Sequence, residues 1–240
     1  DLSTAKSPQQ MFGAISKTYI AQKLGLDPAK IFSVSIMPCV AKKFECDVEQ
    51  VNDAGRGKDV DLVLTTRELD RLISCDSIKP QDLMDVPFDD IFGEGSGAAV
   101  IFGTTGGVME AALRSAYYLV TGSNPDPDAF KEVRGMNGWK EAKFDLAGTT
   151  LKAAVASGLG NARKLIDAVN RGEVEYDFVE IMACPGGCVG GGGQPFVDGE
   201  EFAPKRALKL YGLDKVNHLR FSPENQAVTQ TYQEYLGKPL

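Results

Sequence analysis

A strand-like segment that runs directly into a cysteine and a short turn occurs twice in this chain, and this repeat is the strongest constraint on its fold. The first copy reads SVSIMPC and ends at Cys39, and the second reads DFVEIMAC and ends at Cys184. Sites in α/β proteins are commonly built where buried strands end. The repeat therefore predicts two lobes that carry thiols at their strand ends, with a site between them.

The segment that follows the second strand, CPGGCVGGGGQP, adds Cys188 four residues after Cys184 and then a glycine run from Gly190 to Gly193. A disulfide at this spacing would close only a tiny loop, so metal ligation and redox chemistry are the first candidates. Bare backbone lets N–H groups approach a cluster closely and tolerates positive φ. A flexible surface loop is the alternative explanation of such a run, but the flanking cysteines and the Gln-Pro pair that ends it favour a functional role.

Charge and cysteine count narrow the class of protein. The 240 residues carry a net charge of -7, and no clustered basic face is evident, which argues against nucleic-acid or membrane-surface binding. No run approaches the ~20 apolar residues of a spanning helix, and the first residues lack the apolar segment of a signal peptide. These residues therefore look like a piece of a longer chain. The expected location is the cytoplasm, with the periplasm as the alternative. Five cysteines cannot all pair within one chain, so reduced thiols or metal ligands are expected.

Predicted strands and helices alternate, which indicates an α/β fold whose mixed or parallel sheets are flanked by helices. Two lobes are expected, at about 1–121 and 129–240, joined by a Pro-rich linker at about 122–128. The expected elements are a helix at 7–25 with Ser7 as N-cap, a strand at 30–39, a strand and a Thr66-capped helix at 59–74, a loop at 75–90, a strand or extended segment from residue 98 to a glycine turn at 103–107, a helix from there to Leu119, a hairpin at 140–158 turning near Gly148, a helix at 161–172 and a strand at 176–184.

Three thiolates at the mouth of a cleft would form a soft site suited to iron-sulfur clusters or zinc. The C-x3-C spacing is not the C-x2-C of common zinc ribbons and bacterial ferredoxins, although a zinc clip in a redox-inert domain stays an alternative. Lys42 and Glu45 lie three residues apart, close enough for an ion pair. Such a spacing usually indicates a solvent-exposed ion pair on a helix. The nearby Cys39 favours a functional role for these two residues.

Two long motifs, MPCVAKKFE at 37–45 and EIMACPGGCVGGGGQP at 180–195, resemble the second and third signature motifs of the iron-only, or [FeFe], hydrogenases. LSTAKSPQQMFGA near the start and IFGTTGGVMEAALR at 101–114 extend the resemblance over nearly the whole chain. It implies an H-cluster domain, in which a cubane [4Fe-4S] cluster is joined through a cysteine sulfur to a di-iron unit with carbonyl, cyanide and azadithiolate ligands. The implied activity is reversible proton reduction and dihydrogen oxidation, with an electron partner such as ferredoxin and with maturation proteins.

The resemblance also implies roles for individual residues. Cys39, Cys184 and Cys188 would ligate the cubane, with Cys188 bridging to the di-iron unit. Lys42 would donate a hydrogen bond to a cyanide, and Glu45 would hold the lysine. The remaining implied residues are the pocket walls Met37, Met182 and Phe102, the neighbours of the diatomic ligands Pro8 and Gln9, and the proton-relay hydroxyl of Ser3.

One part of the family pattern is missing from these residues. The first motif, whose adjacent cysteines supply the fourth cubane ligand and the thiol that passes protons, does not occur here. Cys46 and Cys75 lie in no matching motif and are expected to be incidental thiols, and His218 is not expected to be a ligand. We therefore expect a fragment that lacks its N-terminal part and is inactive alone. A non-catalytic iron-sulfur relative, either an assembly factor or a hydrogen-sensing regulator, is the competing hypothesis.

Overall fold

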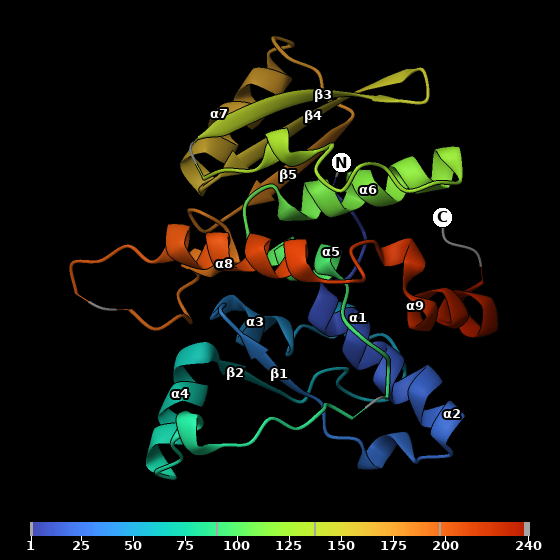
Figure 1. The fold of residues 1–240 in the computed structure, drawn as a ribbon, viewed down its shortest axis with the longest axis vertical. Helices are drawn as coiled ribbons and strands as arrows, with labels where there is room; N and C mark the ends of the chain where they lie inside the picture. Colours follow the sequence, from blue (N-terminus) through green and yellow to red (C-terminus); the bar gives the residue numbers. More distant parts are fainter. Residues whose placement is uncertain (1, 90, 137, 197, 238–240) are drawn as a thin grey trace. The chain divides into compact units, whose positions relative to one another are not determined.

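The computed structural model describes residues 2–89, 91–136, 138–196 and 198–237. This part of the chain contains both helices and strands, and the strands form a two-stranded parallel sheet and a three-stranded mixed sheet (Figure 1). The predicted α/β class is confirmed. The chain divides into two compact units: unit 1 comprises Asp1–Ile91 with Gly192–Pro195, and unit 2 comprises Phe92–Gly191 with Phe196–Leu240.

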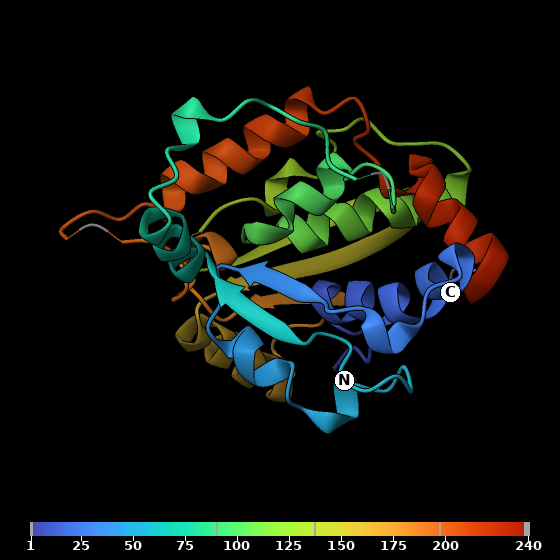
Figure 2. The same cartoon turned by 90° about the horizontal axis from the view of Figure 1, so that it is seen from below.

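Unit 1 contains the parallel strand pair. β1 and β2 run side by side in a register that joins Val34 to Leu62 and Met37 to Thr65 (Figure 2). The elements of unit 1 are α1 (Pro8–Ile15), a π-helical turn (Ser16–Ile20), α2 (Ala21–Leu24), a 3-10 turn (Pro28–Lys30), β1 (Val34–Met37), α3 (Ala41–Glu45), a 3-10 turn (Glu49–Val51), β2 (Leu62–Thr65), α4 (Thr66–Cys75) and a 3-10 turn (Pro80–Asp82). The predicted helix at 7–25 is thus present, with a π-helical turn in its middle.

Two helix starts differ in detail from the prediction. The cap of α4 is Thr65 and not Thr66, because the Thr65 hydroxyl accepts from the Glu68 N–H at 3.2 Å while the Glu68 carboxylate accepts from the Thr65 N–H at 2.8 Å. Ser7 does occupy the N-cap position of α1, but its side chain makes no capping bond and donates to Glu45 instead. The strand predicted at 30–39 pairs only over Val34–Met37, since β2 offers four partner residues.

Unit 2 contains the mixed sheet, in the order β3-β4-β5, with β3 antiparallel and β5 parallel to β4. Its elements are α5 (Gly97–Val100), a 3-10 turn (Ile101–Gly103), α6 (Gly107–Thr121), a 3-10 turn (Lys131–Val133), β3 (Trp139–Leu146), β4 (Thr149–Ser157), α7 (Leu159–Asn170), β5 (Phe178–Met182), a 3-10 turn (Cys188–Gly190), α8 (Ala203–Val216), a 3-10 turn (Ser222–Glu224), α9 (Gln226–Thr231) and a π-helical turn (Tyr232–Leu236). The predicted hairpin, the helix after it and the final strand are confirmed.

The second half of β4, from Ala153 to Ser157, is buried on both faces, which explains its apolar run from Ala153 to Ala156. Ala154 and Ala156 pack against α7, whereas Ala153 and Val155 belong to the core that includes Met109 of α6. Successive side chains of a strand point to opposite faces, and Figure 1 shows α6 and α7 on the two sides of the sheet. This layered packing fixes the end of β5, from which the second cysteine motif begins.

The segment expected to be a strand before the 103–107 turn is helical, as α5 and a 3-10 turn. Its start is capped by the Ser96 hydroxyl, which accepts from the Ala99 N–H. A Cβ atom on Gly97 would lie 2.2 Å from the Asp214 carboxylate. The small residues of this segment therefore allow Asp214 to pack closely against the helical turn. The segment at 122–128, expected to be a linker, lies inside unit 2 after α6.

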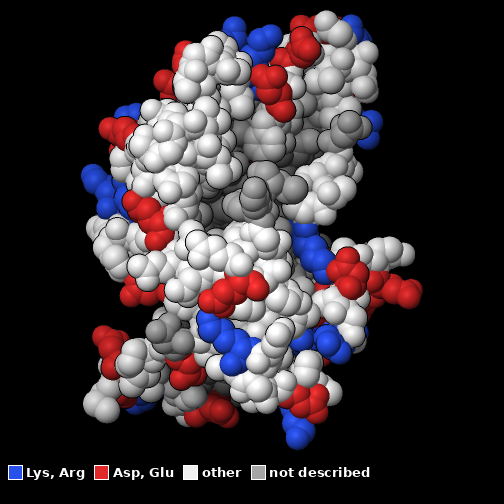
Figure 3. Space-filling model, turned by 90° about the vertical axis from the view of Figure 1, so that its right-hand side faces the viewer, with Lys and Arg blue, Asp and Glu red and all other residues white. Residues whose placement is uncertain are grey.

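The surface charge and the helix lengths of the described residues relate to binding of nucleic acid and to crossing a membrane. On the face drawn in Figure 3, Lys and Arg side chains are interspersed with Asp and Glu. No helix in the described part of the chain is long and apolar enough to cross a membrane.

Candidate functional site

Unit 1 places Cys39 two residues after the end of β1 and two residues before the start of α3. Pro38 has no N–H to continue the sheet, so the strand stops and the half-buried Cys39 begins a new turn. Lys42 follows on the first turn of α3 and forms an ion pair with Glu45. The predicted pairing of these two side chains is therefore present next to Cys39.

The Glu45 carboxylate is held by more than its lysine. It also accepts from the Ser7 hydroxyl and, at 3.1 Å, from the Gln9 amide, which donates as well to the Lys42 carbonyl at 3.3 Å. Burial raises the pKa of Glu45, but the hydrogen bonds from Lys42, Ser7 and Gln9 outweigh it and the net pKa is lowered. Glu45 thus stays charged and fixes one of the three N–H donors of Lys42, which distinguishes this pair from a solvated surface pair.

The second half of the glycine run belongs to unit 1 and packs on the Cys39 turn. The Gly193 N–H donates to the Pro38 carbonyl at 3.0 Å, and the Arg67 N–H donates to the Gly193 carbonyl at 3.0 Å. A Cβ atom on Gly193 would lie 2.9 Å from the Pro38 carbonyl carbon and 3.0 Å from the Cys39 nitrogen. The glycine is required by this close approach, so the run is a fixed part of the Cys39 turn and not a flexible loop.

In unit 2, Cys184 and Cys188 lie on a tight turn after β5, and both are partly buried. The Gly187 N–H donates to the Cys184 carbonyl at 3.0 Å, and the Gly191 N–H donates to the Cys188 carbonyl at 2.9 Å. Gly187 has φ of +92°, a conformation that L side chains rarely adopt. The five-residue turn therefore has an internally bonded backbone.

The turn at 103–107 supports this cysteine turn from outside. The Thr105 N–H donates to the Gly186 carbonyl at 3.1 Å, and the Gly186 N–H donates to the Ser157 hydroxyl at 2.9 Å. A Cβ atom on Gly187 would lie 2.7 Å from the Thr105 nitrogen. Phe102 lies directly before the supporting turn, on the 3-10 turn Ile101–Gly103.

Glu180 connects β5 to the same supporting turn. It is 7% exposed, and its carboxylate accepts from the backbone N–H groups of Gly106 and Met109, both at 2.7 Å, at the start of α6. Burial raises the pKa of Glu180, and the two backbone hydrogen bonds oppose this only in part. The sequence analysis did not identify Glu180 or Ser157 as site residues. An acidic residue inside the otherwise apolar FVEIM was the available signal for Glu180.

The structure places the other predicted residues in different surroundings. Met37 is partly buried, and one side of it packs against the cluster of Cys46, Val60 and Val63. Gln9 is buried, and its Oε1 atom has no hydrogen-bond partner among the described residues. The remaining predicted residues are exposed or partly buried: Ser3, Pro8, Phe102 and Met182.

The residues expected to lie outside the site have ordinary explanations. The Cys46 thiol is buried and donates to the Lys43 carbonyl at 3.0 Å, and burial raises its pKa. Cys75 is exposed at the end of α4. His218 is also exposed and lies 2.8 Å from the Glu94 carboxylate.

The predicted ligand set is divided between the units, with Cys39 in unit 1 and Cys184 and Cys188 in unit 2. Among the described residues, no group of three His, Cys, Asp or Glu side chains is gathered as a metal site. The donor chemistry nevertheless fits an iron-sulfur group, because thiolates are its usual ligands. In unit 1, the unpartnered Oε1 of the buried Gln9, whose amide donates to the Lys42 carbonyl, fits a polar group beside α3.

Two protein families match this chain. Residues 1–192 match the C-terminal domain of the iron-only hydrogenase large subunit. Residues 200–240 match the iron hydrogenase small subunit.

Hydrogenases of known sequence or structure are similar to the chain over most of its length. The NADP-reducing hydrogenase subunit HndD of Solidesulfovibrio fructosivorans is 50% identical over 99% of this chain and 40% of its own length. The periplasmic [Fe] hydrogenase large subunit of Nitratidesulfovibrio vulgaris is 48% identical over 89% of this chain and 51% of its own length. The structure of apo [FeFe]-hydrogenase HydA1 from Chlamydomonas reinhardtii matches with a TM-score of 0.82 and 43% identity, over 99% of this chain and 66% of that one.

Iron-sulfur assembly proteins are more distant relatives. Cytosolic iron-sulfur assembly component 3 of Rattus norvegicus is 33% identical over 98% of this chain and 50% of its own length. The chain thus spans about two fifths to one half of the curated relatives named here. Its first 192 residues match the large-subunit family, and two hydrogenase sequences are 50% and 48% identical to it. The chain therefore belongs to the iron-only hydrogenase family, as a C-terminal part of the large subunit.

Proposed function

We propose that this chain forms the C-terminal part of the H-cluster domain of an iron-only hydrogenase that reduces protons and oxidises dihydrogen. When bound, the H-cluster supplies the redox-active iron and a basic bridging amine for this chemistry. Cys39, Cys184 and Cys188 hold its cubane, and Cys188 also bridges to the di-iron unit. The fourth ligand and the thiol that passes protons come from residues outside these 240.

One observation carries the proposal: the Lys42–Glu45 pair directly after Cys39 is fixed by two further side chains. A protein that held only a cubane would have little use for an oriented ammonium beside a ligand. A di-iron unit with cyanide ligands does have a use for one, because cyanide nitrogen accepts hydrogen bonds from a donor of fixed direction. Ser7 and Gln9 therefore act as positioning residues for Lys42.

The other residues have roles at the walls of the site. Met37, Met182 and Phe102 exclude water from the di-iron unit, while Pro8 and Gln9 neighbour its diatomic ligands. The Gln9 Oε1 atom is one of several buried side-chain oxygens in the described part of unit 1 that have no hydrogen-bond partner. Ser3 carries a hydroxyl for proton relay at the exposed start of the chain.

The partners and compartment follow from the same proposal. Electrons are exchanged with a ferredoxin-like carrier, and maturation proteins install the di-iron unit. We place the protein in the cytoplasm, with the periplasm as the alternative because one relative bears that name.

A second function has a specific observation in its favour. The assembly component of Rattus norvegicus is 33% identical over 98% of the chain, so the scaffold also serves a protein named for cluster assembly. An assembly or sensing protein would bind iron-sulfur clusters without turnover at a di-iron unit. The two functions differ in whether cyanide and carbonyl ligands are ever bound.

The experiment that separates them uses the full-length subunit, produced without oxygen together with hydrogenase maturation proteins. We expect infrared bands of iron-bound carbonyl and cyanide, and dihydrogen production with a reduced electron donor. Lys42→Met should shift or remove the cyanide bands and lower activity about 10- to 100-fold, the usual effect of losing an outer-sphere partner.

Lys43→Met is the matched control. Lys43 lies on the same helix, but it pairs with Glu68 and donates to the Val63 carbonyl. Its substitution should leave the bands unchanged. A protein that binds four-iron clusters but acquires no carbonyl or cyanide would favour the assembly function, and unchanged cyanide bands in Lys42→Met would remove the role given to that residue.

A further inference from the structure

Tyr211 on α8 bonds to the turn at 103–107, which supports the second cysteine turn. The Thr104 hydroxyl is shared between the Ile101 carbonyl, at 2.8 Å, and the Tyr211 hydroxyl, at 2.9 Å. The Tyr211 hydroxyl donates in turn to the Thr105 carbonyl at 3.5 Å. Thr104 and Thr105 are both buried. The phenol therefore joins α8 to a turn 106 residues earlier in the chain.

Thr105 connects this contact to the centre of the cysteine turn. Its N–H donates to the Gly186 carbonyl at 3.1 Å, and its hydroxyl donates to the Ser157 hydroxyl at 3.4 Å. The Ser157 hydroxyl also accepts from the Gly186 N–H at 2.9 Å. Gly186 lies midway between Cys184 and Cys188, so both of its polar backbone groups are bonded to residues outside the cysteine turn.

The contact between the two turns leaves no room for adjustment. A Cβ atom on Gly187 would lie 2.7 Å from the Thr105 nitrogen and 2.9 Å from the Gly103 carbonyl oxygen. Close-packed interiors transmit displacements from one group to the next. A shift of the Thr105 backbone therefore moves the peptide groups that lie between the two cysteines.

The ring of Tyr211 is itself held by two contacts. The Arg134 guanidinium lies 4.5 Å from the ring centroid, and Arg134 donates two hydrogen bonds, both at 2.7 Å, to the fully buried Glu110 of α6. The ring also packs against the core cluster that contains Val189, the residue directly after Cys188. The position of the phenol hydroxyl is therefore set by its surroundings.

The phenol keeps its proton. Burial raises the pKa of Tyr211 above its ordinary value, and the hydrogen bond from Thr104 opposes this only in part. A neutral hydroxyl accepts one hydrogen bond and donates another. Tyr211 can therefore bridge Thr104 and Thr105 at the same time.

We propose that Tyr211 is a positioning residue for the cysteine turn at 184–188, and that it acts through Thr104 and Thr105 on the cluster bound there. The inference rests on the proposed function in one respect, which is that Cys184 and Cys188 ligate a four-iron cluster. The reduction potential of such a cluster depends on hydrogen bonds to its sulfurs and on solvent exposure. Loss of the Tyr211 hydroxyl should therefore change the potential while the fold stays intact.

The test uses the full-length subunit, produced without oxygen and without maturation proteins, so that the four-iron cluster is studied without the di-iron unit. Its potential is measured by a redox titration followed by electron paramagnetic resonance, on the signal that Cys184→Ser removes. Tyr211→Phe should change the one-electron reduction equilibrium about 3- to 10-fold, where 10-fold corresponds to about 59 mV. Iron should also be released to a chelator about 10-fold faster.

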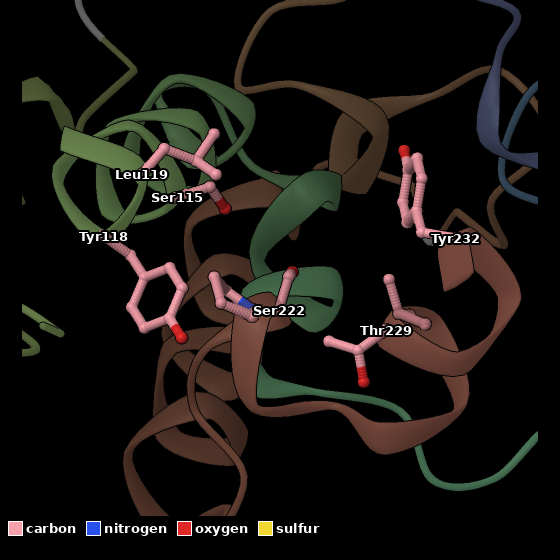
Figure 4. Close-up of a pocket in the computed structure, with 8 residues that line it drawn as sticks. Ser115, Tyr118, Leu119, Ser222, Thr229 and Tyr232 are labelled. Atoms are coloured by element: carbon pink, nitrogen blue, oxygen red, sulfur yellow. The ribbon is translucent and has the colours of Figure 1, made fainter. Parts of the chain in front are cut away.

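Two other tyrosines of unit 2 provide matched controls. Tyr176 donates to the Glu141 carboxylate, and Tyr118 on α6 lines a cavity of about 340 Å³ (Figure 4). Neither phenol bonds to a described residue of the 103–107 turn. Tyr176→Phe and Tyr118→Phe should therefore keep the potential and the rate of iron release of the unsubstituted protein.

Thr104→Val tests the proposed connection itself, because it removes the hydroxyl that bonds to Tyr211 and keeps the tyrosine. It should shift the potential in the same direction as Tyr211→Phe. The double variant should shift the potential by less than the sum of the two single variants, since both substitutions remove the same hydrogen bond. A fully additive double variant would refute the connection through Thr104.

Urea unfolding separates positioning from folding, since Tyr211→Phe should unfold at the same urea concentration as Tyr176→Phe. If Tyr211→Phe does not fold, Thr104→Val carries the test. A potential and an iron release that match the controls would overturn the inference and leave the proposed function standing. Equal changes in the controls would also overturn it. An unsubstituted protein without a four-iron cluster that depends on Cys184 would overturn the ligand assignment, and the inference with it.

Discussion

Replacing Glu180 tests whether the second cysteine turn depends on the carboxylate that joins β5 to α6. In Glu180→Ala, the N–H groups of Gly106 and Met109 lose a buried charged acceptor at 2.7 Å each. Two such bonds contribute about 3–6 kcal/mol together, and releasing a carboxylate from a buried site returns part of that sum. We therefore expect the free energy of unfolding of unit 2 to fall by about 2–4 kcal/mol.

The pH dependence provides an independent check. Because burial raises the folded-state pKa of Glu180 above its unfolded value, folding favours the protonated carboxyl. The stability contributed by this shift is full below about pH 4.5, the ordinary value for this carboxyl, and is lost as pH rises through the folded pKa. Glu180→Gln cannot titrate, so its difference in stability from the unsubstituted protein should be largest at low pH and shrink as pH rises.

The assay is urea unfolding of the full-length subunit, followed by circular dichroism at several pH values, with bound iron measured on the same samples. Glu173→Gln is the control, since Glu173 is an exposed residue that pairs with Arg171 and should change stability by no more than about 1 kcal/mol. A loss below about 1 kcal/mol in Glu180→Ala, or a stability difference for Glu180→Gln that grows with rising pH, would refute the reasoning.

Two further substitutions test the glycine contact and the ligand assignment. Gly193→Ala places a Cβ 2.9 Å from the Pro38 backbone, so it should destabilise unit 1 by about 1–3 kcal/mol in urea unfolding and lower the bound iron. In the control Gly192→Ala, the Cβ meets only Val40 at 3.7 Å, so neither the stability nor the iron content should change. Cys46→Ser should retain full iron content, because Cys46 is assigned to the core, and a loss of iron with intact folding would make it a ligand.

The fold could be predicted where side-chain pattern decides it. The hairpin near Gly148 and the helix after it follow from apolar periodicity and a glycine turn, and both are present. The segment from residue 98 could not be assigned by periodicity, because a short run of small apolar residues suits a strand or a helix equally. Its conformation depends on the Ser96 cap and on the approach of Asp214, a contact 117 residues away along the chain from Gly97.

In the candidate site, the sequence identified residues that share a motif but not residues that act through contacts distant along the chain. Cys39, Lys42 and Glu45 could be identified because they share one short motif, and the ion pair between the last two is present. Glu180 and Ser157 could not be identified from the sequence, because they accept hydrogen bonds from backbone N–H groups of turns that are distant along the chain. No spacing rule in a single sequence specifies such a contact.

Each cysteine turn is shaped mainly by backbone hydrogen bonds within its own unit. Gly193 bonds to Pro38 beside Cys39, and Thr105 bonds to Gly186 between the other two cysteines. None of these bonds uses a cysteine side chain, so replacing a thiol by a hydroxyl leaves the backbone of the turn intact. Loss of iron from such a variant, when the protein still unfolds at the same urea concentration, therefore reports on ligation itself and not on collapse of the turn.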